Sequence, residues 1–214
     1  MAVTCRCGGW KCVRSVFPLR ENEKKALPDN SDLTHSMPMQ YVCKYSSPLG
    51  DMTMAGNGHA LTGVWFDGQK YFPPIPAGIR EAPDCPVFRQ ARAWLDRYFD
   101  GENPGEMPAL YVEGTPFRMM VWNILREIPY GTVLTYGDIA RQIARREGKA
   151  HMSAQAVGGA VGHNPVSIFI PCHRVVGNDG SLTGYAGGLS VKGKLLSLEG
   201  VANDGWRITP FRKE

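Results

Sequence analysis

The sequence predicts an α+β fold: a small N-terminal unit built on an antiparallel sheet, then a C-terminal unit with a winged-helix-like helix-turn-helix. Short apolar runs separated by turn residues between residues 41 and 66 indicate the sheet. Apolar residues at helical spacing indicate a helix over residues 87–99 and further helices after residue 116. Two helices and a compact third one in the second half resemble a helix-turn-helix.

The first unit is expected to contain three strands and one helix. Strands are predicted over residues 41–45 and 51–55, joined by the turn Ser47-Pro48-Leu49-Gly50. Asn57-Gly58 is a hairpin signal that introduces a third strand over residues 60–66. The following helix ends at Gly101, and nothing in this unit indicates chemistry of its own.

In the second unit, each helix is expected to begin at a capping residue. Thr115 precedes Pro116, which suits a first helical turn, and Thr135 precedes the second helix. Ser153 precedes a third helix over residues 154–161 that is almost entirely alanine, glycine and valine. Each interior glycine costs about 1 kcal/mol, so a close contact should offset it. We expect either packing against another part of the protein or close approach to the narrow minor groove of a nucleic acid.

Length and composition indicate a globular protein of one or two domains. We expect a disordered or loosely attached extension at 1–39, an N-terminal α+β domain at 40–113 and a C-terminal domain at 114–214. No apolar run approaches the roughly 18 residues that span a bilayer, and residues 1–16 do not resemble a secretory signal. We therefore expect a cytoplasmic protein without a membrane partner, associated with the nucleoid if the source is bacterial.

The charge distribution and the cysteines indicate which partners and metals the protein could bind. Within the net charge of +4, residues 116–214 carry twelve Lys and Arg against seven Asp and Glu, which favours a polyanionic partner. Cys5, Cys7 and Cys12 could hold a metal, but structural zinc takes four ligands and the nearest histidine is His35. No cofactor is expected to be required, and a structural zinc is left open as an extra.

Cys172 is the candidate nucleophile. It follows the apolar residues 166–170, which are predicted to form a buried strand, and it precedes His173. The thiolate is the reactive form of cysteine, and a neighbouring base is one way to generate it near neutral pH. Most free cysteines are small buried side chains, so this pair alone leaves catalysis undecided.

An ordered series of motifs surrounds this pair. In chain order the motifs are Gly114-Thr115-Pro116-Phe117, Ile128-Pro129-Tyr130-Gly131, Thr135-Tyr136-Gly137-Asp138-Ile139-Ala140, Ala156-Val157-Gly158-Gly159-Ala160, Asn164-Pro165, Pro171-Cys172-His173-Arg174-Val175, Tyr185-Ala186-Gly187-Gly188-Leu189 and Leu198-Glu199-Gly200. Together they resemble the O6-alkylguanine-DNA alkyltransferases, also called methylated-DNA–protein-cysteine methyltransferases. The resemblance is strong over residues 114–201, extends over 40–113 and does not include 1–39.

The resemblance implies direct-reversal DNA repair. A protein of this family binds the minor groove, rotates the damaged nucleotide out of the duplex and transfers the alkyl group from guanine O6 to its own cysteine, once per molecule. Cys172 would be the nucleophile and alkyl acceptor, with His173 as the base through a water and Glu199 fixing the His173 ring. Asn164 would brace the turn between the recognition helix and the active-site strand.

Further residues are implied in binding. Tyr136 would help to rotate the target phosphate and bind the flipped guanine, whose edge the backbones of Cys172, Val175 and Ala186 would read. The full set expected to bind DNA or the base is Tyr136, Gln155, Ala156, Gly158, Arg174, Val175, Tyr185 and Ala186. One departure stands out, because better-known members carry an arginine where this chain has Gln155. Simpler interpretations are a core aromatic for Tyr136, a solvated helix residue for Glu199 and an ordinary turn former for Asn164.

The implied partner is double-stranded DNA containing O6-alkylguanine, with activity on O4-alkylthymine left open. No obligate protein partner is expected, and the protein is expected to be a monomer. Two alternatives are a non-catalytic module that recognises alkylated DNA and an alkylation-responsive regulator. Retention of Cys172 argues against the first, and residues 1–39 are short for the extra domain that the second requires. A thiol hydrolase lacks support, because no oxyanion-hole pattern accompanies the Cys-His pair.

Overall fold

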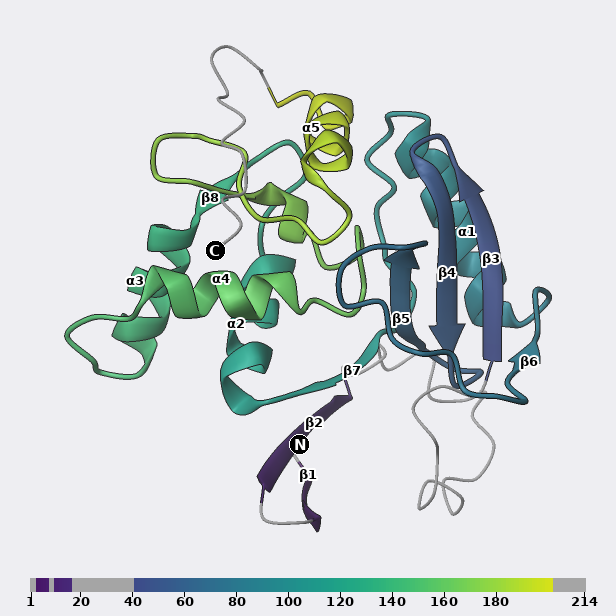
Figure 1. The fold of residues 1–214 in the computed structure, drawn as a ribbon, viewed down its shortest axis with the longest axis horizontal. Coiled ribbons are helices and arrows are strands. Elements are labelled where there is room, and N and C mark those ends of the chain that lie inside the picture. Colours follow the sequence, from purple (N-terminus) through teal and green to yellow (C-terminus); the bar gives the residue numbers. More distant parts are fainter. Residues whose placement is uncertain (1–2, 8–9, 17–40, 202–214) are drawn as a thin grey trace.

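The computed structural model describes residues 41–201 in full and the backbone of residues 3–7 and 10–16. Two units lie side by side, a sheet with one helix behind it and a group of short helices (Figure 1). No helix in the described part of the chain has the length and apolar character needed to cross a membrane.

The N-terminal unit is a sheet of strand order β5-β4-β3-β6 with α1 on one face (Figure 1). Strands β3 and β4 pair antiparallel from Tyr41 opposite Gly56 to Ser47 opposite Gly50, so the predicted turn lies where the sequence indicated it. The elements are β3 (Tyr41–Ser47), β4 (Gly50–Gly56), β5 (Leu61–Phe66), β6 (Arg80–Glu81) and α1 (Pro86–Phe99).

Helix α1 packs on the sheet through one apolar stripe. Its buried residues are Val87, Phe88, Ala91, Trp94, Leu95 and Tyr98, which recur at the spacing of one helical face. Pro86 begins the helix at a position that needs no backbone N–H. Phe88, Leu95 and Tyr98 are fully buried, so this stripe closes the core of the unit.

A small second sheet joins the chain start to the connection between the units. Strands β1 (Val3–Cys7) and β2 (Trp10–Val16) form an antiparallel pair, and β2 pairs with β7 (Tyr111–Gly114). Most of the range 1–39, which we expected to be loosely attached, lies outside the described residues, as do the side chains of Cys5, Cys7 and Cys12. The expectations of a loose extension and of an optional zinc there stay predictions.

The C-terminal unit consists of short helices whose starts follow the predicted caps. Thr115 Oγ1 accepts from the Arg118 backbone N–H, and Ser153 Oγ accepts from that of Ala156. Thr135 and Asp138 form a reciprocal capping box. The elements are α2 (Pro116–Arg126), β8 (Leu134–Thr135), α3 (Tyr136–Arg146), α4 (Ala154–Gly162), a 3₁₀ turn (Cys172–Arg174), β9 (Val175–Val176) and α5 (Leu189–Leu198).

The predicted strand over residues 166–170 is wrong. Only an isolated bridge joins Val166 to Val64, and the chain then turns toward Cys172. The Asn164 side chain is the physical reason, since it bonds the Val166 N–H and the Ile170 carbonyl and so competes with a strand ladder. Ile168 is buried at φ 70°, a left-handed conformation that costs a β-branched residue roughly 1–3 kcal/mol.

Candidate active site

Cys172 opens a buried 3₁₀ turn between the two units. Its side chain is almost fully enclosed, and the turn continues through His173 and Arg174, which are also buried. The preceding segment is fixed to the N-terminal sheet, because the Ser167 N–H donates to the Val64 carbonyl at 2.8 Å. The nucleophile candidate therefore stands on a turn that is hydrogen-bonded to the N-terminal sheet through the preceding segment.

Asn164 connects the end of α4 to this turn. Its Nδ2 lies 3.1 Å from the Cys172 sulfur and 2.7 Å from the Ile170 carbonyl oxygen. Its Oδ1 accepts from the Val166 N–H at 3.0 Å. With all these contacts buried, Asn164 is more than an ordinary turn former.

Next to Cys172, four buried side chains are connected by hydrogen bonds: Tyr98, His173, Arg174 and Glu199. His173 Nε2 lies 2.7 Å from Glu199 Oε1, and Arg174 donates to both carboxylate oxygens at 2.7 and 2.9 Å. The Tyr98 hydroxyl donates to the same Oε1 at 2.7 Å. The Glu199 side chain is fully buried, so the interpretation of a solvated helix residue does not hold.

The Glu199 carboxylate fixes the tautomer of His173. The ion pair with Arg174 and the hydrogen bond from His173 outweigh burial and hold the pKa of Glu199 at about 2, so it is ionised and can only accept. His173 Nε2 must therefore carry the proton in the neutral ring. The other ring nitrogen, Nδ1, is buried and has no hydrogen-bond partner among the described residues, which leaves it as a free acceptor.

Burial keeps the resting Cys-His pair neutral. It raises the pKa of the Cys172 thiol, although the Asn164 amide and the Lys192 charge act in the opposite direction. It also lowers the pKa of His173, against the opposing effect of Glu199. Because the Cys172 thiol is protonated and His173 is neutral at rest, a thiolate forms only by proton transfer during the reaction.

Two side chains bond carbonyls of the segment 175–184, which follows the 3₁₀ turn. The Tyr136 hydroxyl donates to the carbonyls of Thr183 and Gly184 at 3.1 and 3.2 Å. Lys192 is fully buried on α5, and its ammonium donates to the carbonyls of Val175 and Thr183. Burial lowers the pKa of Lys192 to about 8 and raises that of Tyr136 to about 12. Both therefore remain donors at neutral pH.

The structure brings most of the expected base-reading residues to this place. Val175 leaves the turn directly, and the Tyr185 ring packs edge-on against His173 with centroids 6.5 Å apart. The Ala186 carbonyl accepts from the Lys70 N–H of the N-terminal unit at 3.1 Å. Arg174 differs, because its guanidinium is occupied by Glu199 and by the Ile128 carbonyl inside the protein.

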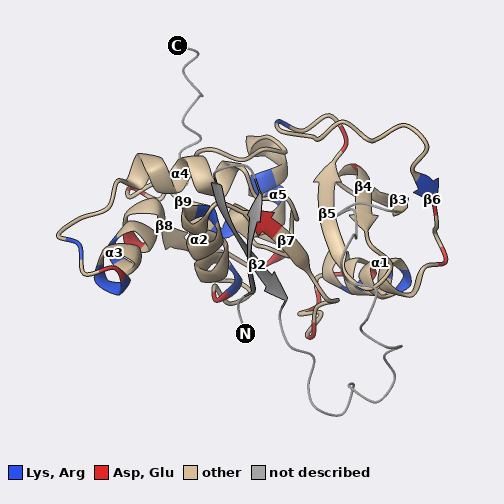
Figure 2. Cartoon of the chain, turned by 90° about the horizontal axis from the view of Figure 1, so that it is seen from below, with Lys and Arg blue, Asp and Glu red and all other residues tan. Residues whose placement is uncertain are grey.

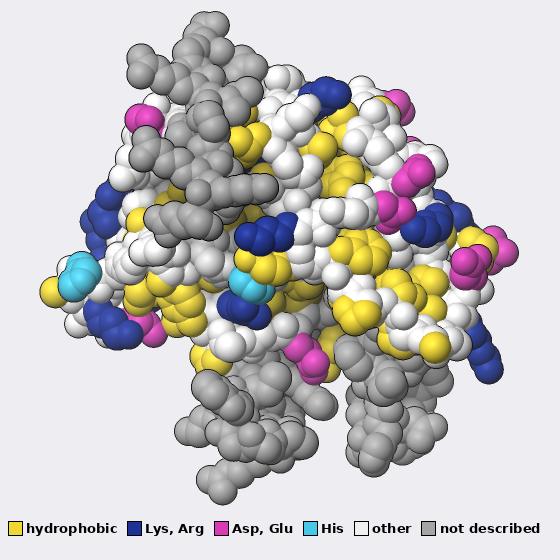
Figure 3. All heavy atoms as spheres, viewed as in Figure 1, with side chains coloured by type: hydrophobic (Ala, Val, Ile, Leu, Met, Phe, Trp, Pro, Cys, Tyr) yellow, Lys and Arg dark blue, Asp and Glu magenta, His cyan; other side chains and the backbone are white. Residues whose placement is uncertain are grey.

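Helix α4 presents an uncharged, small-residue face to solvent (Figure 2). Gln155, Ala156 and Gly159 are exposed, while Val157, Ala160 and Val161 face the core. A Cβ added at Gly159 would meet nothing, and one at Gly158 would make ordinary contact with Tyr136 at 3.8 Å. Close packing within the protein therefore does not account for these glycines. In Figure 3, white atoms (backbone and uncharged polar side chains) and yellow apolar side chains lie between scattered charged side chains on the half of the surface that holds the helices.

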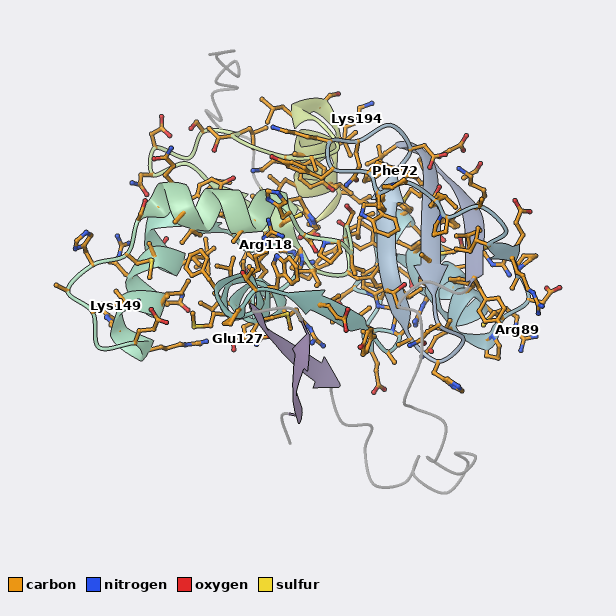
Figure 4. All side chains as sticks on the ribbon, turned by 60° about the horizontal axis from the view of Figure 1, so that its bottom comes forward. Phe72, Arg89, Arg118, Glu127, Lys149 and Lys194 are labelled. Carbon is orange, nitrogen blue, oxygen red and sulfur yellow. The ribbon has the colours of Figure 1, made fainter. Side chains whose placement is uncertain are left out.

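Basic residues lie beside α4 and not on it. Arg145 and Arg146 occupy the last turn of α3, and Arg146 pairs with Glu127 at 3.1 Å. Lys149 follows in the connection to α4 and pairs with Glu147 at 2.7 Å (Figure 4). No group of three or more metal-binding side chains occurs in the part of the chain described with side chains.

Sequence reasoning missed Tyr98 and Lys192. Tyr98 has the spacing of a core residue on α1, and no pattern in the sequence connects it with a carboxylate 101 positions later. Lys192 carries a weak signal, since it lies on the same helix as the buried Leu195 and Leu196. A lysine in an apolar stripe marks a group that needs internal partners.

Two family models match the chain. One is described as 6-O-methylguanine DNA methyltransferase, DNA binding domain, over residues 116–201, and the other as its ribonuclease-like domain, over residues 41–106. The methylated-DNA–protein-cysteine methyltransferase of Haemophilus influenzae is 42% identical over 161 residues, which cover 74% of this chain and 86% of the relative. The chain belongs to the 6-O-methylguanine-DNA methyltransferase family.

Other members agree in sequence and in fold. The methyltransferase of Methanosarcina acetivorans is 42% identical over 160 residues, covering 75% of this chain and 98% of the relative. The crystal structure of Mycobacterium tuberculosis OGT in complex with DNA matches with a TM-score of 0.66 and 40% identity, over 74% of this chain and 92% of that one. The predicted family and the α+β fold of this methyltransferase are thereby confirmed.

Proposed function

We propose that this protein repairs DNA by moving the alkyl group of O6-alkylguanine onto the sulfur of Cys172. The observation that carries the proposal is the arrangement at the 3₁₀ turn. A buried thiol is held by Asn164, and the adjacent His173 has one nitrogen committed to Glu199 and the other free to accept a proton. Nucleophile, base and orienting carboxylate are the parts that such a displacement needs.

Helix α4 is the element that we propose enters the minor groove. Its exposed face carries small, uncharged residues, and Gly159 has no internal neighbour that would exclude a side chain. A smooth helix suits the narrow groove, while the basic residues at the end of α3 lie beside it for phosphate contact. Because the reacting oxygen is hidden in a stacked base, the guanine has to leave the duplex.

The chemistry balances without a cofactor. The Cys172 thiol proton passes to His173 Nδ1, through a bridging water, and the sulfur attacks the alkyl carbon. The S–C bond forms as the C–O6 bond breaks, and the electron pair of the C–O6 bond stays with the guanine. The guanine takes up one proton at N1, which balances the proton that the thiol gave to His173. The resulting thioether has no good leaving group, so each molecule reacts once. A reducing compartment such as the cytoplasm keeps the thiol available, and we propose that location.

The flipped guanine is read by backbone and by Tyr136. We propose that main-chain groups of Val175, which directly follows the 3₁₀ turn, and of Ala186 read the base, and their side chains need no polarity for that role. Support comes from Lys192, which holds the Val175 and Thr183 carbonyls. Tyr136 stays protonated, so its hydroxyl can turn from the Thr183 and Gly184 carbonyls to donate its one proton to the base.

A single-turnover incubation tests the proposal. The protein is mixed with a duplex containing O6-methylguanine, followed by intact and peptide mass analysis. We expect a gain of one CH2 on the peptide with Cys172 and restoration of guanine. Cys172→Ala should abolish transfer, and Cys43→Ala is the matched control because Cys43 is also a buried free thiol. Transfer that persists in Cys172→Ala, or retention of the lesion without any mass change, would contradict the proposal.

A further inference from the structure

Tyr98 brings the N-terminal unit into direct contact with the catalytic group. It lies on α1, is fully buried, and donates from its hydroxyl to Glu199 Oε1 at 2.7 Å. The same hydroxyl oxygen is 3.4 Å from His173 Nε2. The two residues that it contacts lie 101 and 75 positions later in the sequence, in the C-terminal unit.

The direction of these hydrogen bonds follows from charge. Glu199 is ionised and accepts from Tyr98, from His173, from Nε and Nη2 of Arg174 and from the Gly131 N–H. Burial and the carboxylate together raise the pKa of Tyr98 far above its ordinary value, so the phenol keeps its proton. Tyr98 and His173 therefore donate to one and the same carboxylate oxygen.

Resting on the function proposed above, we infer that Tyr98 is a positioning residue for alkyl transfer. Its hydroxyl holds Glu199 Oε1 in place, and Glu199 in turn keeps the proton on His173 Nε2 and leaves Nδ1 free to accept the thiol proton. The N-terminal unit then supplies one polar contact to the reaction, in addition to its packing.

The ring of Tyr98 has a separate packing role, which allows the two functions to be distinguished. It stacks on Trp94 at 5.4 Å and meets Phe99, Tyr130 and His173 edge-on, at 5.4, 6.1 and 6.5 Å. Phenylalanine preserves all these ring contacts. Tyr98→Phe therefore removes the hydroxyl from Glu199 and leaves the core filled.

Loss of the hydroxyl should strengthen the pairing of His173 with Glu199. The carboxylate loses one donor, so its attraction for a proton on the ring increases and the pKa of His173 rises. The other groups that face this ring remain in place. Besides Tyr98, the titratable and charged residues around His173 are Cys172, Arg174, Tyr185, Lys192 and Glu199. A higher pKa of the base moves the acid limb of the pH–rate profile to higher pH.

The test compares Tyr98→Phe with Tyr45→Phe in the full-length protein. Tyr45 is a matched control, because it is a buried tyrosine of the same unit whose hydroxyl donates to a different carboxylate, that of Asp96, at 2.9 Å. Single-turnover transfer from an O6-methylguanine duplex is measured across pH, with affinity for the unmodified duplex alongside. For Tyr98→Phe we expect a rate lower by roughly tenfold, a small part of what a positioned base contributes. We also expect an acid limb at higher pH and an unchanged affinity.

The outcomes separate this inference from the proposed function. A wild-type protein that transfers no alkyl group overturns the function itself. Wild-type transfer with Tyr98→Phe equal to Tyr45→Phe in rate and in pH profile overturns the role of Tyr98. So does a slower Tyr98→Phe with an unshifted profile, since general destabilisation would produce that.

A measurement on the wild type does not depend on the variant folding. Nitrogen-15 NMR of labelled histidine should assign the Nε2–H tautomer to neutral His173, because Glu199 can only accept. An Nδ1–H tautomer overturns the inference whatever the variants do.

Discussion

The side-chain amide of Asn164 joins the end of α4 to the sulfur of Cys172, with Nδ2 only 3.1 Å from Sγ. The same nitrogen also contacts the Ile170 carbonyl at 2.7 Å, and the amide oxygen holds the Val166 N–H. One side chain thus sets the path of the turn and places a donor on the nucleophile. A displacement of α4 by DNA would be transmitted to the sulfur through this contact.

Asn164→Ala is therefore predicted to impair both stability and transfer. The Val166 N–H and the Ile170 carbonyl lose a buried partner, which costs about 1–3 kcal/mol for each such group. We expect unfolding in urea at a clearly lower midpoint and alkyl transfer slower by at least about tenfold, equivalent to roughly 1.4 kcal/mol in the barrier. Asn57→Ala, which removes an amide that holds the His59 and Ala60 N–H groups, is the control for transfer. Equal rates in the two variants would contradict the bracing role.

The pH dependence of transfer follows from the neutral resting pair. His173 can accept the thiol proton only while it is unprotonated, and burial lowers its pKa below the ordinary value of 6.5. The single-turnover rate should therefore hold as the pH falls to 6.5 and decline only below it. Binding to unmodified DNA is measured at the same pH values to separate binding from chemistry. An acid limb centred above 6.5 would mean that Glu199 raises the pKa of His173 more than burial lowers it.

The sequence predicted correctly those features that depend on a few neighbouring residues. The caps at Thr115, Thr135 and Ser153 are read from a few adjacent residues, and the structure agrees at each. The prediction of a strand over residues 166–170 was wrong. These apolar residues are buried in a turn, and the Asn164 side chain, which lies before them in the sequence, fixes that turn. Apolar character alone does not distinguish a buried turn from a buried strand.

Long-range contacts at the site were beyond any sequence pattern. Tyr98 resembles every other core residue of α1 until the fold brings it to Glu199. The family resemblance supplied roles for Cys172, His173 and Glu199, because motifs in a fixed order carry such information. It supplied nothing for a tyrosine of the first unit, because all of these motifs lie at residue 114 or later.

Lys192→Met is predicted to slow transfer with little effect on DNA affinity. The change leaves the Val175 and Thr183 carbonyls without their charged donor and so loosens the segment 175–184 that follows the 3₁₀ turn. Lys192 is buried and cannot reach a phosphate, so binding to unmodified duplex should hold. Lys194→Met is the matched control, since Lys194 is exposed on the same helix (Figure 4). A parallel loss in both variants would indicate a nonspecific effect of charge.

Stability against pH gives an independent check on Lys192. Its native pKa of about 8 lies below the ordinary 10.5, so the unfolded chain binds more protons between these values. The free energy of unfolding then rises with pH over that window, by about 3 kcal/mol for this group. Urea titrations should find this rise in the wild type and in Lys194→Met, and it should be missing in Lys192→Met. A rise of equal size in all three would refute a buried, charged Lys192.

Gly159→Gln should lower the affinity for DNA without lowering the stability of the protein. A Cβ at this position meets nothing in the protein, and glutamine favours an interior helical position over glycine by up to about 1 kcal/mol. The melting temperature should therefore hold or rise, while affinity for duplex DNA falls because the longer side chain obstructs the groove. Ser197→Gln adds comparable bulk to an exposed position of α5 and should leave affinity unchanged. Full affinity in Gly159→Gln would remove the case for α4 in the minor groove.

Gln155→Arg tests the position at which this chain departs from the better-known members of its family. Gln155 is exposed near the start of α4, two residues after the cap Ser153. Glutamine can hydrogen-bond an orphaned base, but guanidinium adds charge and a planar surface that stacks in the gap left by the flipped nucleotide. We expect tighter binding to lesion-containing duplex and a faster single-turnover rate. Gln142→Arg on α3 adds the same charge away from the start of α4 and separates a general electrostatic gain from a specific one. If Gln155→Arg leaves affinity and rate flat or lowers both, this residue does not occupy the position that fills the gap.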